Sequence, residues 1–303
     1  MNRLFGALAL AAALGMVAQA SASTVAFSDT EGTAGLYTET HFSADDYVEY
    51  GFDYSLAGRL TADIGTPNPG DTPTGILVAA NIVGAGLDAG LNLFPILPKS
   101  SYYTLEFDVF AGVNNGGGST EFIMAGANTS GTEVNIDAGA IDARDGDWFE
   151  HSTEGGIGSD FITFTAVGGS QIAEDFIGNT SAPLTTALPS PPYPVQGAAG
   201  ELWANYRVVS TPTVTEFYIN GVFIESLVGS DYSSGLPMFG YSDIFSSVAG
   251  GDSPLVADGV SDFDPFNASF AIFDNIVVTV PEPSSLALFA LSMVGLASRR
   301  SIR

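Results

Sequence analysis

The body of this 303-residue chain is a succession of short runs of β-branched and aromatic residues, separated by Gly, Pro, Asn and Ser. Between Thr24 and Val280, no apolar stripe with helical spacing is long enough to indicate a helix. The candidate strands are residues 24–27, 47–56, 75–82, 102–113, 120–127, 161–167, 202–210, 213–219, 222–227 and 269–280. The pattern therefore predicts a nearly all-β body.

Three segments indicate how the strands connect. Asn220-Gly221 lies between two β-forming runs and is the preferred pair for a two-residue turn with positive φ, so it predicts a tight hairpin. The Gly-rich segment 114–118 predicts a second, longer hairpin within residues 107–122. Five prolines between residues 181 and 197 exclude a central strand and predict a long surface loop.

About ten strands in one chain without an internal repeat or a domain linker predict a single antiparallel sandwich of two sheets. Trp203, Tyr206, the hairpin at Asn220-Gly221 and the strand at 273–278 resemble the second half of a concanavalin A-like jelly roll. An immunoglobulin-like or other β-sandwich fits the same strands. The expected organisation is a signal peptide at residues 1–22, the sandwich at 23–279 and a sorting tail at 280–303.

Both ends of the chain carry an apolar segment. Arg3 precedes an apolar run at residues 4–17, and small residues at 18, 20 and 22 provide cleavage sites, which predicts a signal-peptide helix that is read by the Sec export machinery. At the other end, the apolar run 286–297 spans roughly 18 Å as a helix. A hydrocarbon layer is about 30 Å thick, so we expect a short hydrophobic helix that crosses the membrane transiently before processing.

The order of residues in this tail is specific. Pro281-Glu282-Pro283 comes first, the apolar run follows, and Arg299 and Arg300 end it. This tail resembles the PEP-CTERM sorting signal of exported Gram-negative proteins. The resemblance covers about the last two dozen residues. It implies processing by an exosortase in bacteria that make extracellular polysaccharide.

Composition excludes several functions. Eight Lys and Arg residues stand against 34 Asp and Glu residues, for a formal net charge of −26. A surface this anionic repels phosphate backbones, so we expect no nucleic-acid partner. The chain has no cysteine, which excludes disulfides and thiolate metal sites.

Glu106 and Asp108 are weak candidates for catalytic residues. They alternate on one predicted strand, as do the carboxylates in glycoside hydrolases of the concanavalin-like fold, whose motif has a further Glu two or three residues later. Here Phe110 and Ala111 occupy those positions, so the acid/base is missing. We expect both carboxylates to belong to the polar face of a half-buried strand.

Asp142, Asp145 and Asp147 are weak candidates for calcium ligands, since calcium prefers several oxygen ligands presented by loops and Gly146 permits a tight turn. The alternative is that they are solvated surface carboxylates. His41 and His151 have no adjacent nucleophile motif, and we expect both on the surface or in loops.

These features predict an exported, non-enzymatic sandwich protein of the cell surface or of the extracellular matrix, associated with exopolysaccharide and without a required cofactor. The alternative is a concanavalin-like glycoside hydrolase or lectin that acts on polysaccharide. A purely structural matrix protein is a third possibility. The rings of Trp148, Phe149, Tyr193 and Trp203 are of the kind that stacks on sugars, but aromatic residues of a sandwich more often belong to the core, so the sequence assigns no carbohydrate-binding site.

Overall fold

The computed structural model describes residues 23–55, 66–81, 88–113, 121–137, 144–155, 160–167, 170–228, 234–244 and 269–282. The predicted signal peptide and the predicted apolar tail helix lie outside these ranges. By its internal contacts the chain divides into a large unit, Phe27–Val278, and a small one, Met1–Ala26 with Thr279–Arg303. The described residues form fifteen strands and one short helix, which confirms the predicted all-β class.

The first sheet has eight strands, in the order β13-β12-β11-β6-β15-β4-β3, with β1 paired to β15. Its strands are β1 (Ser23–Asp29), β3 (Asp46–Asp53), β4 (Thr74–Ala80), β6 (Tyr103–Gly112), β11 (Trp203–Ser210), β12 (Val214–Ile219), β13 (Val222–Val228) and β15 (Phe270–Pro281). We call it sheet A.

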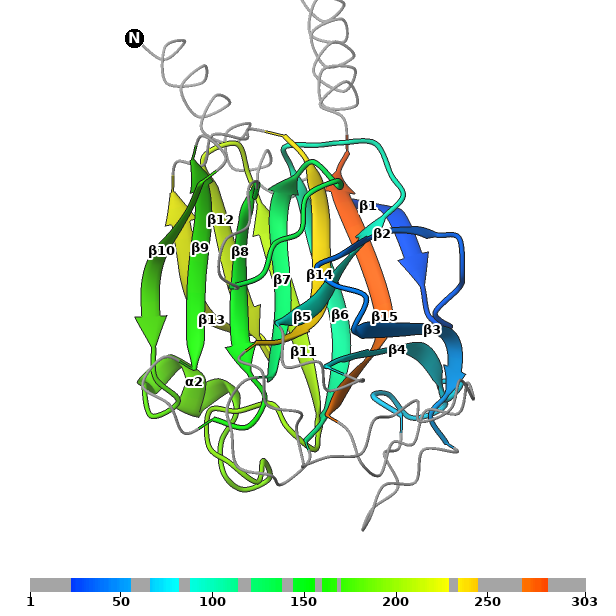
Figure 1. Ribbon diagram of the computed structural model, residues 1–303, viewed down its shortest axis with the longest axis vertical. Coiled ribbons are helices and arrows are strands. Elements are labelled where there is room, and N and C mark those ends of the chain that lie inside the picture. The colour runs from blue at the N-terminus through cyan, green and yellow to red at the C-terminus, as the bar shows by residue number, and fades with distance from the viewer. Residues whose placement is uncertain are drawn as a thin grey trace, which may run out of the picture. The chain divides into compact units, whose positions relative to one another are not determined.

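The second sheet, sheet B, has seven strands in the order β10-β9-β8-β7-β14-β5-β2. Its strands are β2 (Tyr37–His41), β5 (Ala89–Pro95), β7 (Glu121–Thr129), β8 (Asp147–Ser152), β9 (Phe161–Val167), β10 (Ser170–Ile177) and β14 (Leu236–Asp243). Figure 1 shows the two sheets as facing layers, with sheet B in front. The predicted two-sheet antiparallel sandwich is therefore confirmed.

An aromatic layer fills the space between the sheets. Phe107 of β6 lies 5.4 Å from Phe239 of β14 between ring centroids, and Tyr206 of β11 stacks on Phe149 of β8 at 5.7 Å. Alternate residues of a strand point to opposite faces, so each of these rings faces the other sheet. Phe217 of β12 extends the layer, and its ring centroid lies 5.2 Å from that of Phe149. Burial of these rings supplies most of the cohesion between the sheets.

Sheet B is covered on its other face as well. Trp148 directly precedes Phe149, so its side chain points to the opposite face of sheet B. There its ring stacks on that of Phe164, with centroids 5.1 Å apart. A second buried cluster surrounds this pair: Phe94, Phe122, Met124, Ile136, Ile162, Ala166, Met238 and Ile244. Strands β5, β7 and β8 are consequently buried along their whole length.

One predicted hairpin is confirmed and the other is wrong. Asn220 and Gly221 have φ of 48° and 76°, the left-handed pair that a two-residue hairpin between β12 and β13 requires. The expected hairpin within residues 107–122 does not form, because β6 and β7 lie in different sheets. Both edges of β6 are occupied by β11 and β15, so no edge is left for β7.

The Pro-rich segment contains a short helix, α2 (Ala182–Ala187), where a plain surface loop was predicted. Pro183 lies in the first turn, where the missing N–H needs no partner. Leu184 and Leu188 are fully buried and anchor the segment to the sandwich. Loops with buried leucines do not behave as solvated connections.

The aromatic layer predicts that replacing two different phenylalanines with alanine lowers the free energy of unfolding by very different amounts. Phe107 is fully buried, whereas Phe176 on β10 is 56% exposed. Phe107→Ala should lower the free energy of unfolding by about 3–5 kcal/mol, because it opens a cavity between the sheets. The control Phe176→Ala should change it by less than about 0.5 kcal/mol. Denaturant unfolding measures both, and equal losses would contradict the assigned core.

Candidate functional site

Glu106 and Asp108 lie on the outer face of sheet A, as their alternation predicted. Glu106 is exposed, between buried Leu105 and Phe107. Asp108 is half-buried, and its two carboxylate oxygens accept hydrogen bonds from the side-chain amides of Asn205 and Asn275, each at 3.0 Å. Both oxygens of Asp108 are therefore already engaged by the protein.

A third carboxyl, that of Asp274 on β15, lies on the same face as Glu106 and Asp108. Asp274 accepts a hydrogen bond from the hydroxyl of Tyr54 at 2.8 Å, and the amide of Asn275 also reaches Asp71 at 3.2 Å. Burial raises the pKa of Asp274 to about 6, and the charges of Asp71 and Asp108 add to the rise. The outer face of sheet A thus carries an acidic cluster that is bound to its own amide and hydroxyl donors.

Two of the predicted calcium ligands have other partners. Asp145 accepts a hydrogen bond from the backbone N–H of Ser130 at 2.6 Å. Asp147 faces between the sheets and accepts bonds from the hydroxyls of Thr165 and Thr215, each at 2.8 Å. Asp142 lies outside the described residues. Within the described ranges no group of three His, Cys, Asp or Glu residues suits a metal ion. Calcium binding stays a prediction.

His151 was expected at the surface, and this expectation is wrong. It lies on β8 between the sheets, fully buried, with Nδ1 2.7 Å from the hydroxyl of Tyr206 and Nε2 2.9 Å from the carbonyl oxygen of Gly197. A carbonyl only accepts, so Nε2 carries the proton and Nδ1 accepts from Tyr206. Burial lowers the pKa of His151 to about 4, so the ring is neutral and structural.

Glu150 also lies on β8, and its side chain is buried on the face of sheet B that points away from sheet A. One oxygen accepts a hydrogen bond from the backbone N–H of Asp137 at 2.6 Å, and the other has no partner among the described residues. Burial raises the pKa of Glu150 to about 8, and the charge of Asp137 adds to the rise. A perturbed carboxyl can indicate a catalytic site. Glu150, however, has no exposed surface that a solute could touch.

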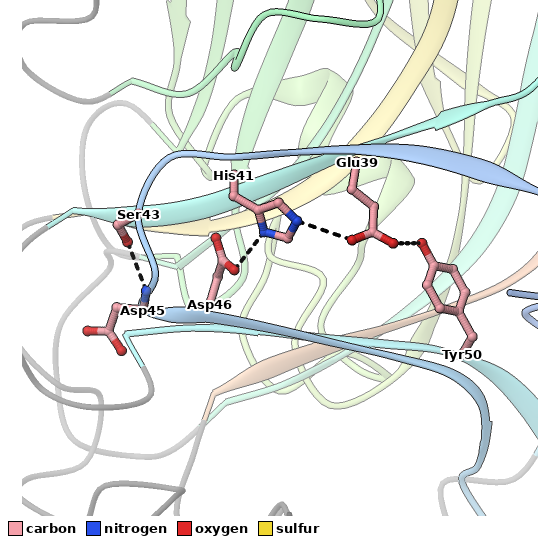
Figure 2. A network of polar contacts seen from close by, with 6 residues as sticks. All are labelled: Glu39, His41, Ser43, Asp45, Asp46 and Tyr50. Atoms are coloured by element: carbon pink, nitrogen blue, oxygen red, sulfur yellow. Dashed lines mark hydrogen bonds and ion pairs between the residues drawn. The ribbon is translucent and has the colours of Figure 1, made fainter. Parts of the chain in front are cut away.

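His41 belongs to a polar network at the edge of the sandwich (Figure 2). Its Nδ1 lies 2.8 Å from a carboxylate oxygen of Asp46, and its Nε2 lies 3.1 Å from Glu39. The hydroxyl of Tyr50 donates to the other oxygen of Glu39 at 2.6 Å. The sequence analysis did not find this network, although the spacing of Glu39 and His41 places them on one face of a strand.

This His41 network joins the two sheets. Glu39 and His41 lie on β2, the edge strand of sheet B, and Asp46 and Tyr50 lie on β3, the edge strand of sheet A. The chain between them turns through Ser43, whose hydroxyl oxygen accepts from the backbone N–H of Asp45 at 3.2 Å. Ionic and hydrogen bonds thus supplement the aromatic contacts at this edge, where Tyr37 of β2 stacks on Tyr50 of β3 with ring centroids 5.9 Å apart.

The electrostatics of the network are coupled. Burial pulls the pKa of His41 down, but the hydrogen bonds to and charges of Asp46 and Glu39 outweigh it and leave the pKa raised. Burial also raises the pKa of Asp46, whose side chain is only 5% exposed. At Asp46 burial therefore outweighs the attraction of His41, whereas at His41 the attraction outweighs burial, so the net stabilisation of the pair is small. In the described part of the chain, the side chain of His41 contacts the carboxylates of Asp46 and Glu39, and these contacts connect the two edge strands.

The sorting motif begins at the end of β15. Pro281 is exposed, and Glu282 follows it directly, whereas Pro283, Arg299 and Arg300 lie outside the described residues. Residues 279–301 match the PEP-CTERM protein-sorting motif. The chain therefore carries this motif, which indicates export and surface attachment through an exosortase. In the described ranges no helix has the length and apolarity needed to span a membrane.

The sandwich is similar to several solved structures. A galectin-like protein from Bacillus subtilis is 8% identical, over 86% of this chain and 98% of that one, with a TM-score of 0.46. The metal-free carbohydrate recognition domain of Emp46p is 10% identical, over 85% and 97%, with a TM-score of 0.42. A family 16 endo-glucanase from Bacteroides ovatus is 8% identical, over 83% and 99%, with a TM-score of 0.41.

These likenesses concern the fold alone, which is a two-sheet antiparallel β-sandwich. No protein with a curated description matches the chain.

The His41 network predicts a stability difference that depends on pH. A histidine whose folded pKa is raised contributes stability that is complete below the unfolded pKa, about 6.5, and is lost as the pH rises through the folded pKa. His41→Gln should therefore lower the free energy of unfolding at pH 5.5 by about 0.5–1 kcal/mol, discounted because the side chain is 40% exposed.

The same variant should differ less from the parent chain at pH 9, and also less at pH 5.5 in 1 M salt. Denaturant unfolding at the two pH values measures this. A deficit of the same size at both would show that His41 acts through packing alone.

Proposed function

We propose that the protein is a non-catalytic component of the bacterial cell surface that associates with extracellular polysaccharide. The PEP-CTERM motif at residues 279–301 is the observation that carries the proposal. The resemblance of the tail to such signals implies a host that makes extracellular polysaccharide. The exported body therefore reaches a compartment in which polysaccharide is the abundant polymer.

The arrangement of carboxyls supports a non-catalytic role. Retaining and inverting glycosidases both need two accessible carboxyls that flank the scissile bond. Asp108 has both oxygens engaged by amides, and Glu150 is sealed from solvent. Neither is placed to protonate a leaving group, and Phe110 is packed against Trp203 where the hydrolase motif would have a carboxylate.

The alternative is a hydrolase or lectin of the same fold. One observation favours a hydrolase: Glu106 and Asp108 share the outer face of β6, roughly 7 Å apart along the strand. This spacing of the two backbone positions falls within the roughly 6.5–9.5 Å that separate the carboxyl groups of inverting enzymes. An activity assay separates the two proposals.

For a non-catalytic protein, the full chain should bind the exopolysaccharide of its host without releasing reducing ends above a blank. Glu106→Gln and Asp108→Asn should release the same background amount, since neither carboxyl is asked to react. Co-sedimentation and a reducing-sugar assay on one sample measure both. Turnover that disappears in either variant would establish the hydrolase instead.

Processing of the tail is a separate prediction. The cell-surface form should lack residues 286–303, because the apolar run is too short for a stable anchor. Replacing Pro281, Glu282 and Pro283 with alanines should keep the tail and hold the protein in the inner membrane. Intact-mass spectrometry of both fractions decides, and a surface form that still ends at Arg303 would contradict processing.

A further inference from the structure

The outer face of sheet A carries an ordered row of four side chains, one from each of four adjacent strands. Phe223 of β13 pairs with Tyr218 of β12, Tyr218 with Arg207 of β11, and Arg207 with Glu106 of β6. We call this set the Arg207 row. Its ends are separated by three strand spacings, roughly 14 Å.

The burial pattern places the row on the solvent side. Arg207 lies between buried Tyr206 and Val208, and Tyr218 lies between buried Phe217 and Ile219. Strands β11 and β12 alternate in this way along their length, so one face packs inward and the other faces away from sheet B. The side chains of the row therefore share one surface.

The row begins with an exposed aromatic ring. Phe223 is 46% exposed and meets Tyr218 edge to face, with centroids 5.5 Å apart. The hydroxyl of Tyr218 donates to Glu216 at 2.8 Å, which fixes the plane of its ring. Exposed aromatic surface bordered by polar groups is typical of a binding site, and such rings pack against the C–H faces of sugars.

Arg207 provides hydrogen-bond donors at the centre of the row. Its guanidinium carbon lies 4.1 Å from the centroid of the Tyr218 ring, a cation–π contact that holds the planar group in place. In the described part of the chain, Arg207 forms no ion pair and no side-chain hydrogen bond, and its Nε is buried without a partner. The terminal N–H groups of the guanidinium also have no acceptor among the described residues, but unlike Nε they are not buried, so they can donate to a ligand that accepts hydrogen bonds.

The missing ion pair is unusual in a chain with a net charge of −26. Glu106 is the cross-strand neighbour of Arg207, yet the two side chains do not pair within 4 Å. Donors and acceptors thus lie side by side without satisfying each other. Sugar hydroxyls both donate and accept, and so can bridge the two groups.

Charge decides between neutral and acidic glycans. Glu106 forms one end of the row, Glu216 lies beside Tyr218, and the whole chain is strongly anionic. A polyuronate would meet this repulsion at close range and at long range, whereas a neutral chain would not. Only one cation of the row, Arg207, opposes it.

We infer that the Arg207 row binds a neutral polysaccharide chain of the extracellular matrix, with Phe223 and Tyr218 packing on sugar rings while Arg207 donates to and Glu106 accepts from their hydroxyls. This inference rests on the proposed association with polysaccharide and assigns it to one face. The row lies across four strands, so the bound chain runs roughly perpendicular to them.

The test uses the protein as its host exports it, purified from the cell surface, and the host's own exopolysaccharide, divided by anion exchange into a neutral and an acidic fraction. The exported protein should bind the neutral fraction at least about tenfold more tightly than the acidic one. Phe223→Ala and Arg207→Gln should each weaken neutral binding about tenfold to a hundredfold. Arg207→Lys should also weaken it, because lysine keeps the charge but loses the planar fork.

Val228→Ala is the matched control, since Val228 lies on the same strand as Phe223 and is 75% exposed. It should bind as the parent chain does. Thermal melts of all variants confirm that they remain folded. If the parent binds and the row variants bind equally well, the assignment of the face is wrong while association with polysaccharide stands.

Two further outcomes are equally informative. Binding to the acidic fraction alone overturns the neutral ligand but keeps the association. Binding to neither fraction overturns the proposed function and this inference together.

Discussion

The contact between the two sheets through their aromatic layer is the constraint on which the remaining structure depends. A chain without cysteine has no disulfide between its two sheets, so their cohesion comes mainly from burial of apolar surface. Phe107, Phe239 and Phe273 form a triangle of contacts across the gap, with centroid distances of 5.0 to 5.6 Å. Every outward-facing side chain of β6, β11 and β12 owes its direction to an inward neighbour in this layer.

The strands that the sequence predicted and those it missed differ mainly in the sheet to which they belong. All ten predicted strands form, and eight of them lie in sheet A, where strands such as β11 alternate between buried and partly exposed residues along their length. The five missed strands, β2, β5, β8, β10 and β14, all belong to sheet B. In β8, Glu150 and His151 are both fully buried, so the polar residues of this strand do not indicate exposure to solvent. Strands β5 and β8 are buried on both faces, and such a strand has no alternation of apolar and polar residues to detect.

The candidate sites divide in a similar way. Alternation alone placed Glu106 and Asp108 on one face, because that inference needs only the geometry of a single strand. The His41 network needs two edge strands from different sheets, and the Arg207 row needs the register of four strands. Pairing between distant strands is set by tertiary packing, and a single sequence does not specify it. His151 shows the same limit, since its partners Tyr206 and Gly197 are tens of residues away.

The acidity of the chain has different consequences at its two sites. In the His41 network, carboxylates on both sheet edges converge on one histidine, so negative charge contributes to holding the sandwich closed. Around Arg207, carboxylates surround a cation that stacks on Tyr218 instead of pairing with them. An ion pair there would neutralise the donors and acceptors that a hydroxylated ligand needs. The stacked position keeps the positive charge stabilised by the ring while its N–H groups stay free, which is how a strongly anionic surface can retain a usable arginine.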